Sequence, residues 1–399
     1  MIKRFMHAVF VFSLLAVNSA IADVRLPIHD KFQSQILSEK RSIVIQLPSS
    51  YNKDSKRKYP VMYLLDGPSN LSHTSGTLDF LSLSGEVPEL IIVAIANTNR
   101  TRDLTPPLKN NKETEGGGAN KFLDFLEKEL IPYIDGLYRT EDYKIITGHA
   151  LAGLFAIHSL HTRPHLFQAH FAFSPSLSWD EKSTVTDAIN FFAKTPTLKN
   201  FLYMNIGDQK GQVRTAFDEL SEALYNKKPN EFIFKREYFE KETHMTTPVI
   251  GQFYAYRELF ANWAFPTANM GLGIKAAEEH YIKLSEYFGF HIPMSENTLN
   301  AMGYYHLVQK KDPKAAIKIF ARNVMEFPKS ANTYDSLAEA YEADGQIEEA
   351  IKQMDLAVGI VKKDISLFRV ISEHRERLLR KQKSSVENNI EDKVIPTEQ

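Results

Sequence analysis

The chain has 399 residues, of which 43% are hydrophobic and 24% are charged, and its formal net charge is −1. This composition is typical of globular proteins and supplies enough apolar surface for a sizeable core. Because the charges nearly cancel, the sequence gives no electrostatic basis for binding nucleic acid or an anionic membrane surface. The chain has no cysteine, which excludes disulfides, thiolate catalysis and zinc–thiolate sites.

The first residues have the pattern of an export signal. Lys3 and Arg4 are positive, and the apolar run Ala8–Val17 follows them. Ala20–Ala22 then has the small residues of a cleavage site. The apolar run is shorter than the roughly 20 residues of a membrane span. We therefore expect a signal peptide over residues 1–22 and a periplasmic or secreted mature protein without a membrane span.

Short β-rich runs alternate with helical patterns from residue 42 to residue 239. Several runs are continuously apolar, as in strands buried on both faces of a sheet. Helices are expected over Lys121–Ile134 and Leu151–His161. This alternation predicts the α/β class, with a mostly parallel sheet covered by helices on both faces. The expected strands are Ser42–Leu47, Val61–Leu65, Ile91–Ala96, Lys144–Thr147, Ala169–Phe173, Phe201–Ile206 and Phe232–Phe239.

A helical repeat replaces this pattern in the later part of the chain. An internal repeat relates positions 34 residues apart, at Ala316 and Ala350, Phe320 and Met354, and Asn323 and Ala357. That period, with small residues at the helix crossing, is the signature of tetratricopeptide repeats. Only two repeats are clear, and about three are needed for independent stability. We therefore expect this region to associate with a protein partner, with the preceding domain or with a second copy.

These patterns predict three parts of the mature chain. Residues 23–265 are expected to form the α/β domain. Residues 266–381 are expected to form an all-α, tetratricopeptide-like repeat domain. Residues 382–399 are polar and charged, and we expect them to be a disordered tail.

Gly148–Gly153 lies between an expected strand and an expected helix. In α/β-hydrolases the nucleophile sits on such a strand-to-helix turn, where small neighbours permit a strained backbone. The residue in the nucleophile's position is Ala150, and the second small residue of the elbow is Ala152.

Several longer segments carry a family resemblance. By their order and spacing, residues 23–265 resemble the bacterial putative esterase family, which includes siderophore-ester hydrolases, feruloyl esterases and S-formylglutathione hydrolases. The chain most resembles members with C-terminal tetratricopeptide repeats. The resemblance implies an α/β-hydrolase fold and a Gly-His-Ser elbow, in which Ala150 replaces the serine. The segments are Tyr59–Gly67, Asn97–Pro106, Gly117–Thr140, Ile146–Leu160 and Ser174–Asp180.

The same resemblance implies the other catalytic residues. His244, beyond the last expected strand, matches the family's catalytic histidine, which takes the nucleophile's proton and passes it to the leaving group. The acid that orients this histidine is expected at Asp208. Glu240 and Asp218 are alternatives, and so is a serine–histidine pair without an acid.

The oxyanion hole requires two backbone N–H groups directed at the developing negative charge. Leu151, directly after the nucleophile's position, is one expected donor. Gly67 is the other, because the neighbouring Pro68 has no N–H. A plain turn is the alternative interpretation of Gly67.

Three further residues are candidates for substrate binding. Arg100 and Arg102 follow an expected strand at the edge of the sheet where ligands bind. The alternative is an ion pair with Asp103 that holds this loop. Trp179 is expected either to line the substrate pocket or to pack in the core.

Metal and cofactor sites are not expected. Four histidines lie close together in the sequence, but no carboxylate completes a familiar ligand spacing. They are His158, His161, His165 and His170.

The sequence leaves two functions open. The first is a serine-type carboxylic-ester hydrolase for a small-molecule ester, with siderophore-like esters as one candidate, inactive as written because Ala150 cannot form an acyl-enzyme. Loss of the serine is expected to lower turnover by about a millionfold while binding is retained. His149 is not expected to replace the nucleophile. The alternative is a natural pseudoenzyme that binds a ligand or protein through the cleft and the helical repeats.

Overall fold

The computed structural model describes residues 26–52, 55–110, 115–361 and 365–391. The expected signal peptide lies outside these residues. The chain divides into two compact units, the first comprising Val24–Trp263 together with Phe288–Phe290. The second comprises Ala264–Tyr287 and the chain from His291 onward. None of the helices in the described ranges is long and apolar enough to cross a membrane.

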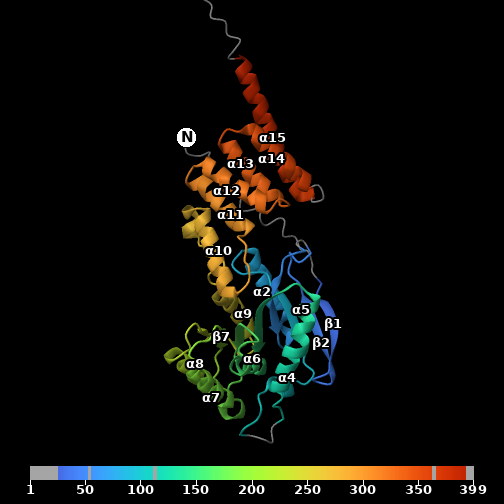
Figure 1. The fold of residues 1–399 in the computed structure, drawn as a ribbon, viewed down its shortest axis with the longest axis vertical. Helices are drawn as coiled ribbons and strands as arrows, with labels where there is room; N and C mark the ends of the chain where they lie inside the picture. Colours follow the sequence, from blue (N-terminus) through green and yellow to red (C-terminus); the bar gives the residue numbers. More distant parts are fainter. Residues whose placement is uncertain (1–25, 53–54, 111–114, 362–364, 392–399) are drawn as a thin grey trace, which may run out of the picture. The chain divides into compact units, whose positions relative to one another are not determined.

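The first unit is built on an eight-stranded sheet with the order β1-β2-β4-β3-β5-β6-β7-β8. Figure 1 shows the paired strands β1 and β2 in blue. Strands β3 to β8 are parallel to one another, whereas β2 is antiparallel to both β1 and β4. This mostly parallel sheet confirms the predicted α/β class. The strands span Ile28–Ser34 (β1), Glu39–Gln46 (β2), Tyr59–Leu64 (β3), Ile91–Ile95 (β4), Thr140–His149 (β5), Ala169–Phe173 (β6), Phe201–Ile206 (β7) and Ile233–Tyr238 (β8).

Helices cover both faces of the sheet. Helices α2 and α9 pack together on one face, while α3, α4, α6, α7 and α8 form a connected layer on the other. The residues of β3, β4, β6 and β7 are all buried between these layers, which explains their continuous apolar runs. The helices span Gly67–Leu83 (α2), Arg100–Leu104 (α3), Ala119–Phe125 (α4), Ile131–Leu137 (α5), Leu151–Thr162 (α6), Trp179–Lys194 (α7), Gln212–Asn226 (α8) and Thr247–Leu259 (α9).

Two local features differ from the sequence-based expectation. The helix expected over Lys121–Ile134 consists of α4, a π-helical turn at Leu126–Leu130 (η1) and α5 in succession. Strand β1 was not expected. It is a largely exposed edge strand with several polar residues, so it lacks the apolar run that marks the buried strands.

The second unit is helical in its described part. Each of the six residues in the 34-residue pattern is buried in α12 or α14. Helices α12, α13, α14 and α15 pack in succession. Assignment to tetratricopeptide repeats stays a prediction. The helices span Thr267–Leu272 (η2, 3-10), Ile274–Phe288 (α10), Glu296–Tyr304 (α11), Tyr305–Gln309 (η3, π), Pro313–Glu326 (α12), Ala331–Ala343 (α13), Ile347–Ile360 (α14) and Ile365–Glu391 (α15).

The end of the second unit also differs from expectation. Helix α15 continues through Glu391, well into the segment 382–399 for which the sequence predicts disorder. The physical reason is that α15 contains neither glycine nor proline, so its backbone has no helix breaker despite its polar composition. Residues 392–399 lie outside the described part.

Candidate active site

Ala150 is the single residue between strand β5 and helix α6. Its φ of 56° and ψ of −114° lie in a region that L-residues rarely adopt. Its N–H donates to the carbonyl of Phe173 at 3.0 Å, and its own carbonyl accepts from the N–H groups of Leu154 at 2.9 Å and Ser176 at 3.0 Å. The tight turn expected of a nucleophile elbow is therefore present and is fixed by three backbone hydrogen bonds.

Small residues make this turn possible. A Cβ on Gly148 would lie 2.5 Å from the Cβ of Ala152, too close for two carbon atoms. The Ala152 methyl is itself fully buried. The alanine in the second small position is thus accommodated because position 148 has no side chain.

The two expected oxyanion donors lie at the same edge of the sheet. Strands β3 and β5 are parallel neighbours, with Leu64 paired to Thr147, and helices α2 and α6 start just beyond them at Gly67 and Leu151. The first N–H groups of a helix have no acceptor within the helix and form the positive end of its dipole. A Cβ on Gly67 would lie 2.5 Å from the backbone of Ala94, so only glycine fits there.

Arg100 connects the two loops at this edge. Its Nε and Nη2 donate to the two carboxylate oxygens of Asp66, each at 2.8 Å. Nη2 also donates to the carbonyl of His149 at 3.2 Å. Asp66 has a φ of 53° and accepts a further hydrogen bond from the Asn97 side chain. Arg100 therefore fixes the start of α2 against the residue that precedes Ala150.

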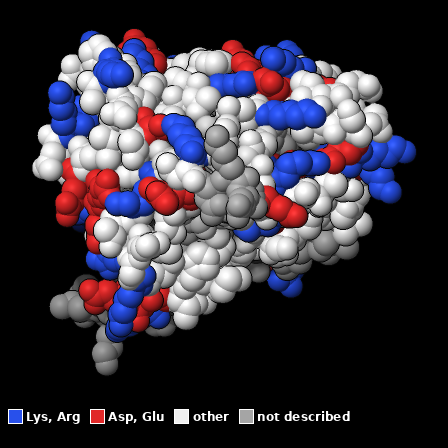
Figure 2. All heavy atoms as spheres, turned by 90° about the horizontal axis from the view of Figure 1, so that it is seen from below, with Lys and Arg blue, Asp and Glu red and all other residues white. Residues whose placement is uncertain are grey.

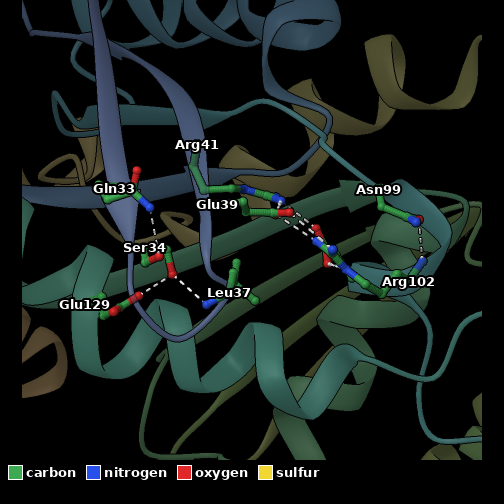
Figure 3. Close-up of polar contacts among 9 residues, drawn as sticks. Gln33, Ser34, Leu37, Glu39, Arg41, Asn99, Arg102 and Glu129 are labelled. Atoms are coloured by element: carbon green, nitrogen blue, oxygen red, sulfur yellow. Dashed lines mark hydrogen bonds and ion pairs between the residues drawn. The ribbon is translucent and has the colours of Figure 1, made fainter.

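Arg102 takes part in a separate ion-pair network, shown in Figure 3. Its guanidinium lies 2.7 Å from both Asp103 and Glu39. The buried Arg41 contacts the same two carboxylates, at 2.7 and 2.6 Å. The Arg102 hydrogen bond, opposed by burial, lowers the pKa of Glu39. These contacts are the loop-holding ion pair that the sequence offered as the alternative to substrate binding.

Trp179 has the environment of a core residue. It is partly buried and packs against the main hydrophobic core at the start of α7. Its Nε1 is buried without a hydrogen-bond partner among the described residues. A Cβ on Gly116 would lie 3.2 Å from its ring, so the loop at residue 116 also closes over it. This geometry favours the packing interpretation.

His244 lies in the loop between β8 and α9, with its ring against that of His149. The two ring centroids are 4.4 Å apart. Burial, with a smaller contribution from the positive charge of Arg100, lowers the pKa of His244. The ring is therefore neutral near pH 7, as a general base must be.

None of the three candidate acids is hydrogen-bonded to His244 in the described structure. Its Nδ1 is buried and has no hydrogen-bond partner among the described residues. Asp208 and Glu240 are exposed. Asp218 bonds instead with Arg214 at 2.8 Å and accepts from the Tyr238 hydroxyl at 2.9 Å. The geometry corresponds to a histidine without an acid.

Sequence reasoning missed two residues that hold the His244 loop. The Nε2 of His149 lies 2.7 Å from the His244 carbonyl, and the Thr247 hydroxyl donates to the same carbonyl at 3.0 Å. The only sequence signal was their proximity to Ala150 and to His244. Next to His149 is a cavity of about 10 Å³, lined also by His73 and Gln252. It has room for about one water molecule, so it is not a substrate pocket.

Positive and negative side chains are interspersed over the face drawn in Figure 2. This face shows no extended region of one sign. The distribution agrees with the near-neutral net charge of the whole chain.

The fold and the elbow together define the class of the protein. A mostly parallel sheet with a strained strand-to-helix turn after a central strand is the architecture of an α/β-hydrolase. The family model described as "Putative esterase" matches residues 34–244, more than half of the chain. The chain belongs to this family of esterases.

Known proteins similar to the chain include siderophore esterases. It is 30% identical to ferri-bacillibactin esterase BesA of Bacillus subtilis (strain 168) over 197 residues, which cover 42% of this chain and 66% of BesA. It is 31% identical to siderophore triacetylfusarinine C esterase of Aspergillus fumigatus over 144 residues, covering 33% of this chain and 49% of that protein. The chain thus spans less than two-thirds of the length of these relatives.

Two solved structures show the likeness in three dimensions. An IroE-like serine hydrolase from Shewanella oneidensis aligns with a TM-score of 0.64 and 30% identity, covering 75% of this chain and 99% of that one. An uncharacterised protein from Capnocytophaga ochracea aligns with a TM-score of 0.61 and 19% identity, covering 89% of this chain and 100% of that one. At that identity the second likeness concerns the fold alone.

Proposed function

We propose that this chain is a serine-esterase scaffold for carboxylic esters in which Ala150 occupies the position of the nucleophilic serine. As written, it binds an ester ligand and hydrolyses it negligibly. The observation that carries the proposal is the backbone of Ala150, which has the rare elbow conformation although its methyl side chain cannot act as a nucleophile. Such a conformation costs roughly 1–3 kcal/mol and persists only where the surroundings impose it.

The chemistry follows from what a serine at position 150 would contact. Its Oγ would attack the ester carbonyl carbon and transfer its proton to the neutral ring of His244. The N–H groups of Gly67 and Leu151 would stabilise the oxyanion, and the protonated ring would then return the proton to the departing alcohol. Water, activated by the same ring, would release the acid. The methyl group of alanine has neither a lone pair nor a transferable proton, so the first step cannot occur.

The substrate class is proposed from the relatives. BesA and triacetylfusarinine C esterase are named for siderophore esters, and a small-molecule ester of that type is the candidate ligand of the site around Ala150 and His244. Residues 1–22, as a signal peptide, would place the protein in the periplasm or outside the cell. The tetratricopeptide-like helices, supported by burial of the 34-residue pattern, would bind a protein partner or a second copy.

A second candidate function is a natural pseudoenzyme that binds its ligand without turnover. Ala152 favours it, because the elbow pattern has glycine at this position and a second change in the elbow is expected of a natural sequence that no longer needs catalysis. In this case the cleft and the helical unit would serve binding alone.

Hydrolysis of p-nitrophenyl butyrate tests the proposal with the chain as written and with Ala150→Ser. We expect no turnover above background for the alanine form and a gain of at least about a thousandfold for the serine form. The double variant Ala150→Ser, His244→Ala is the matched control and should lose the gained activity. A folded but inert serine form would favour the pseudoenzyme. Enzyme-like turnover by the alanine form would contradict our assignment of the elbow.

A further inference from the structure

The main-chain carbonyl of His244 is a meeting point of two side-chain hydrogen bonds. The carbonyl can only accept, so the Nε2 of His149, 2.7 Å away, must carry a proton and donate it. The hydroxyl of Thr247 donates to the same oxygen at 3.0 Å. The two donors come from different parts of the fold, since His149 ends β5 and Thr247 begins α9.

Thr247 is itself held by buried polar groups. Its Oγ1 lies 2.8 Å from the hydroxyl of Ser174, which donates because the Thr247 proton is already used. The Ser174 N–H donates to the side-chain oxygen of Asn205 at 3.1 Å, and the Asn205 amide donates back to the Thr247 carbonyl at 3.2 Å. All three side chains are fully buried. The network therefore connects the ends of β6 and β7 to the carbonyl of His244.

His149 is suited to donate to this carbonyl. Burial and the neighbouring ring of His244 lower the pKa of His149 to about 4, so its ring is neutral near pH 7. A neutral imidazole carries one N–H, and the carbonyl selects the tautomer with that proton on Nε2. The two imidazole rings are in contact, with their centroids 4.4 Å apart.

The His244 ring lacks the usual means of orientation. In a serine–histidine–acid triad, a carboxylate accepts the Nδ1–H and fixes the direction of the imidazole. Here Nδ1 is buried without a hydrogen-bond partner among the described residues. This residue is held by the His149 ring packed against its own ring and by the two hydrogen bonds to its main-chain carbonyl.

We propose that His149 and Thr247 are positioning residues of the esterase site, which fix the His244 imidazole through hydrogen bonds to its main-chain carbonyl in place of a carboxylate on its ring. This inference rests on the proposed function. It assigns to His149, directly before the nucleophile's position, a role in holding His244.

The test uses paired substitutions that remove or keep each donor. His149→Phe keeps a flat ring without an N–H, whereas His149→Gln places an amide N–H near the Nε2 position. Thr247→Val keeps the shape without the hydroxyl, whereas Thr247→Ser keeps the hydroxyl. In the Ala150→Ser background, we expect His149→Phe and Thr247→Val to lower kcat by about 10- to 100-fold with little change in KM. His149→Gln and Thr247→Ser should retain most of the activity.

A second measurement does not depend on activity. In full-length protein with Ala150, ¹⁵N-labelled histidine shows the ring resonances of His244 by NMR. We expect Phe and Val to broaden or shift them, and Gln and Ser to return them towards the parent positions. The two donors lie on different elements. If the variants at one position misfold, the variants at the other position still test the proposal.

The outcomes separate this inference from the proposed function. Unchanged His244 resonances in folded Phe and Val variants would overturn the inference, and so would an unchanged kcat in an active serine form. If Ala150→Ser is inert, the proposed function fails, and the NMR result alone decides whether the two residues hold the ring.

Discussion

Raising the pH from 7 to 9.5 is predicted to loosen helix α15 from helix α13. The Nδ1 of His374 on α15 lies 2.6 Å from Asp335 on α13, and its Nε2 lies 3.7 Å from Glu342. The ring is only 11% exposed. Burial opposes its charge, but the hydrogen bond to Asp335 and the nearby carboxylate of Glu342 outweigh burial and raise the pKa of His374 to about 9. The ring is therefore charged and paired at neutral pH.

The magnitude follows from proton linkage. An unfolded histidine has a pKa near 6.5, so between that value and about 9 the folded protein binds the proton that the unfolded chain has lost. At 1.36 kcal/mol per pH unit this corresponds to roughly 3 kcal/mol, fully present below pH 6.5 and lost as the pH rises through 9. Burial and the charge of Asp335 also raise the pKa of Glu339, to about 8. Its deprotonation over the same range acts in the same direction.

Hydrogen–deuterium exchange of the full-length chain measures this effect locally. After correction for intrinsic exchange rates, peptides from α13 and α15 should lose about 100-fold in protection between pH 7 and 9.5, the equivalent of roughly 3 kcal/mol. His374→Gln is neutral at both pH values, so it should be less protected at pH 7 and show a much weaker pH dependence. Equal pH dependence of parent and variant would refute the assignment of the effect to His374.

Three substitutions in the first unit test the packing by urea unfolding. Gly67→Ala should destabilise by about 1–3 kcal/mol because its Cβ would lie 2.5 Å from neighbouring backbone. Gly76→Ala in the same helix meets nothing within 4 Å and should stabilise by up to about 1 kcal/mol; equal effects of the two would contradict the steric argument. Asp103→Asn should cost about 1–3 kcal/mol because Arg41 and Arg102 lose one charged partner and both keep Glu39; a cost below about 0.5 kcal/mol would contradict this.

The sheet and the elbow could be predicted because their signals are local. The buried strands are apolar runs, since both faces of each strand meet helices. The elbow is recognisable in the sequence by its small residues. The structure explains one of them, because a Cβ on Gly148 would occupy the space of the Ala152 side chain. Edge strand β1 is largely exposed and contains no apolar run, so apolar runs do not predict it.

The arginine roles could not be separated by sequence, because Arg100 and Arg102 share one loop and one chemistry. On a helix, residues two apart point in directions about 200° apart. Within α3 this sends Arg100 to Asp66 at the start of α2 and Arg102 to Glu39 on β2. The hydrogen bonds from His149 and Thr247 to His244 could not be predicted for another reason. Their acceptor is a main-chain carbonyl, which every residue has, so no residue type in the sequence indicates it.

The proposed loss of a nucleophile at position 150 leaves the backbone of the turn in place. The three hydrogen bonds that hold the turn all use main-chain atoms of Ala150, its N–H to Phe173 and its carbonyl to Leu154 and Ser176. None depends on the side chain, so replacing an Oγ by hydrogen leaves the strained backbone in place. The N–H groups of Gly67 and Leu151, which we propose as oxyanion donors, are likewise main-chain groups. A serine would therefore enter a turn that is already formed, and recovery of activity by Ala150→Ser should need no second substitution.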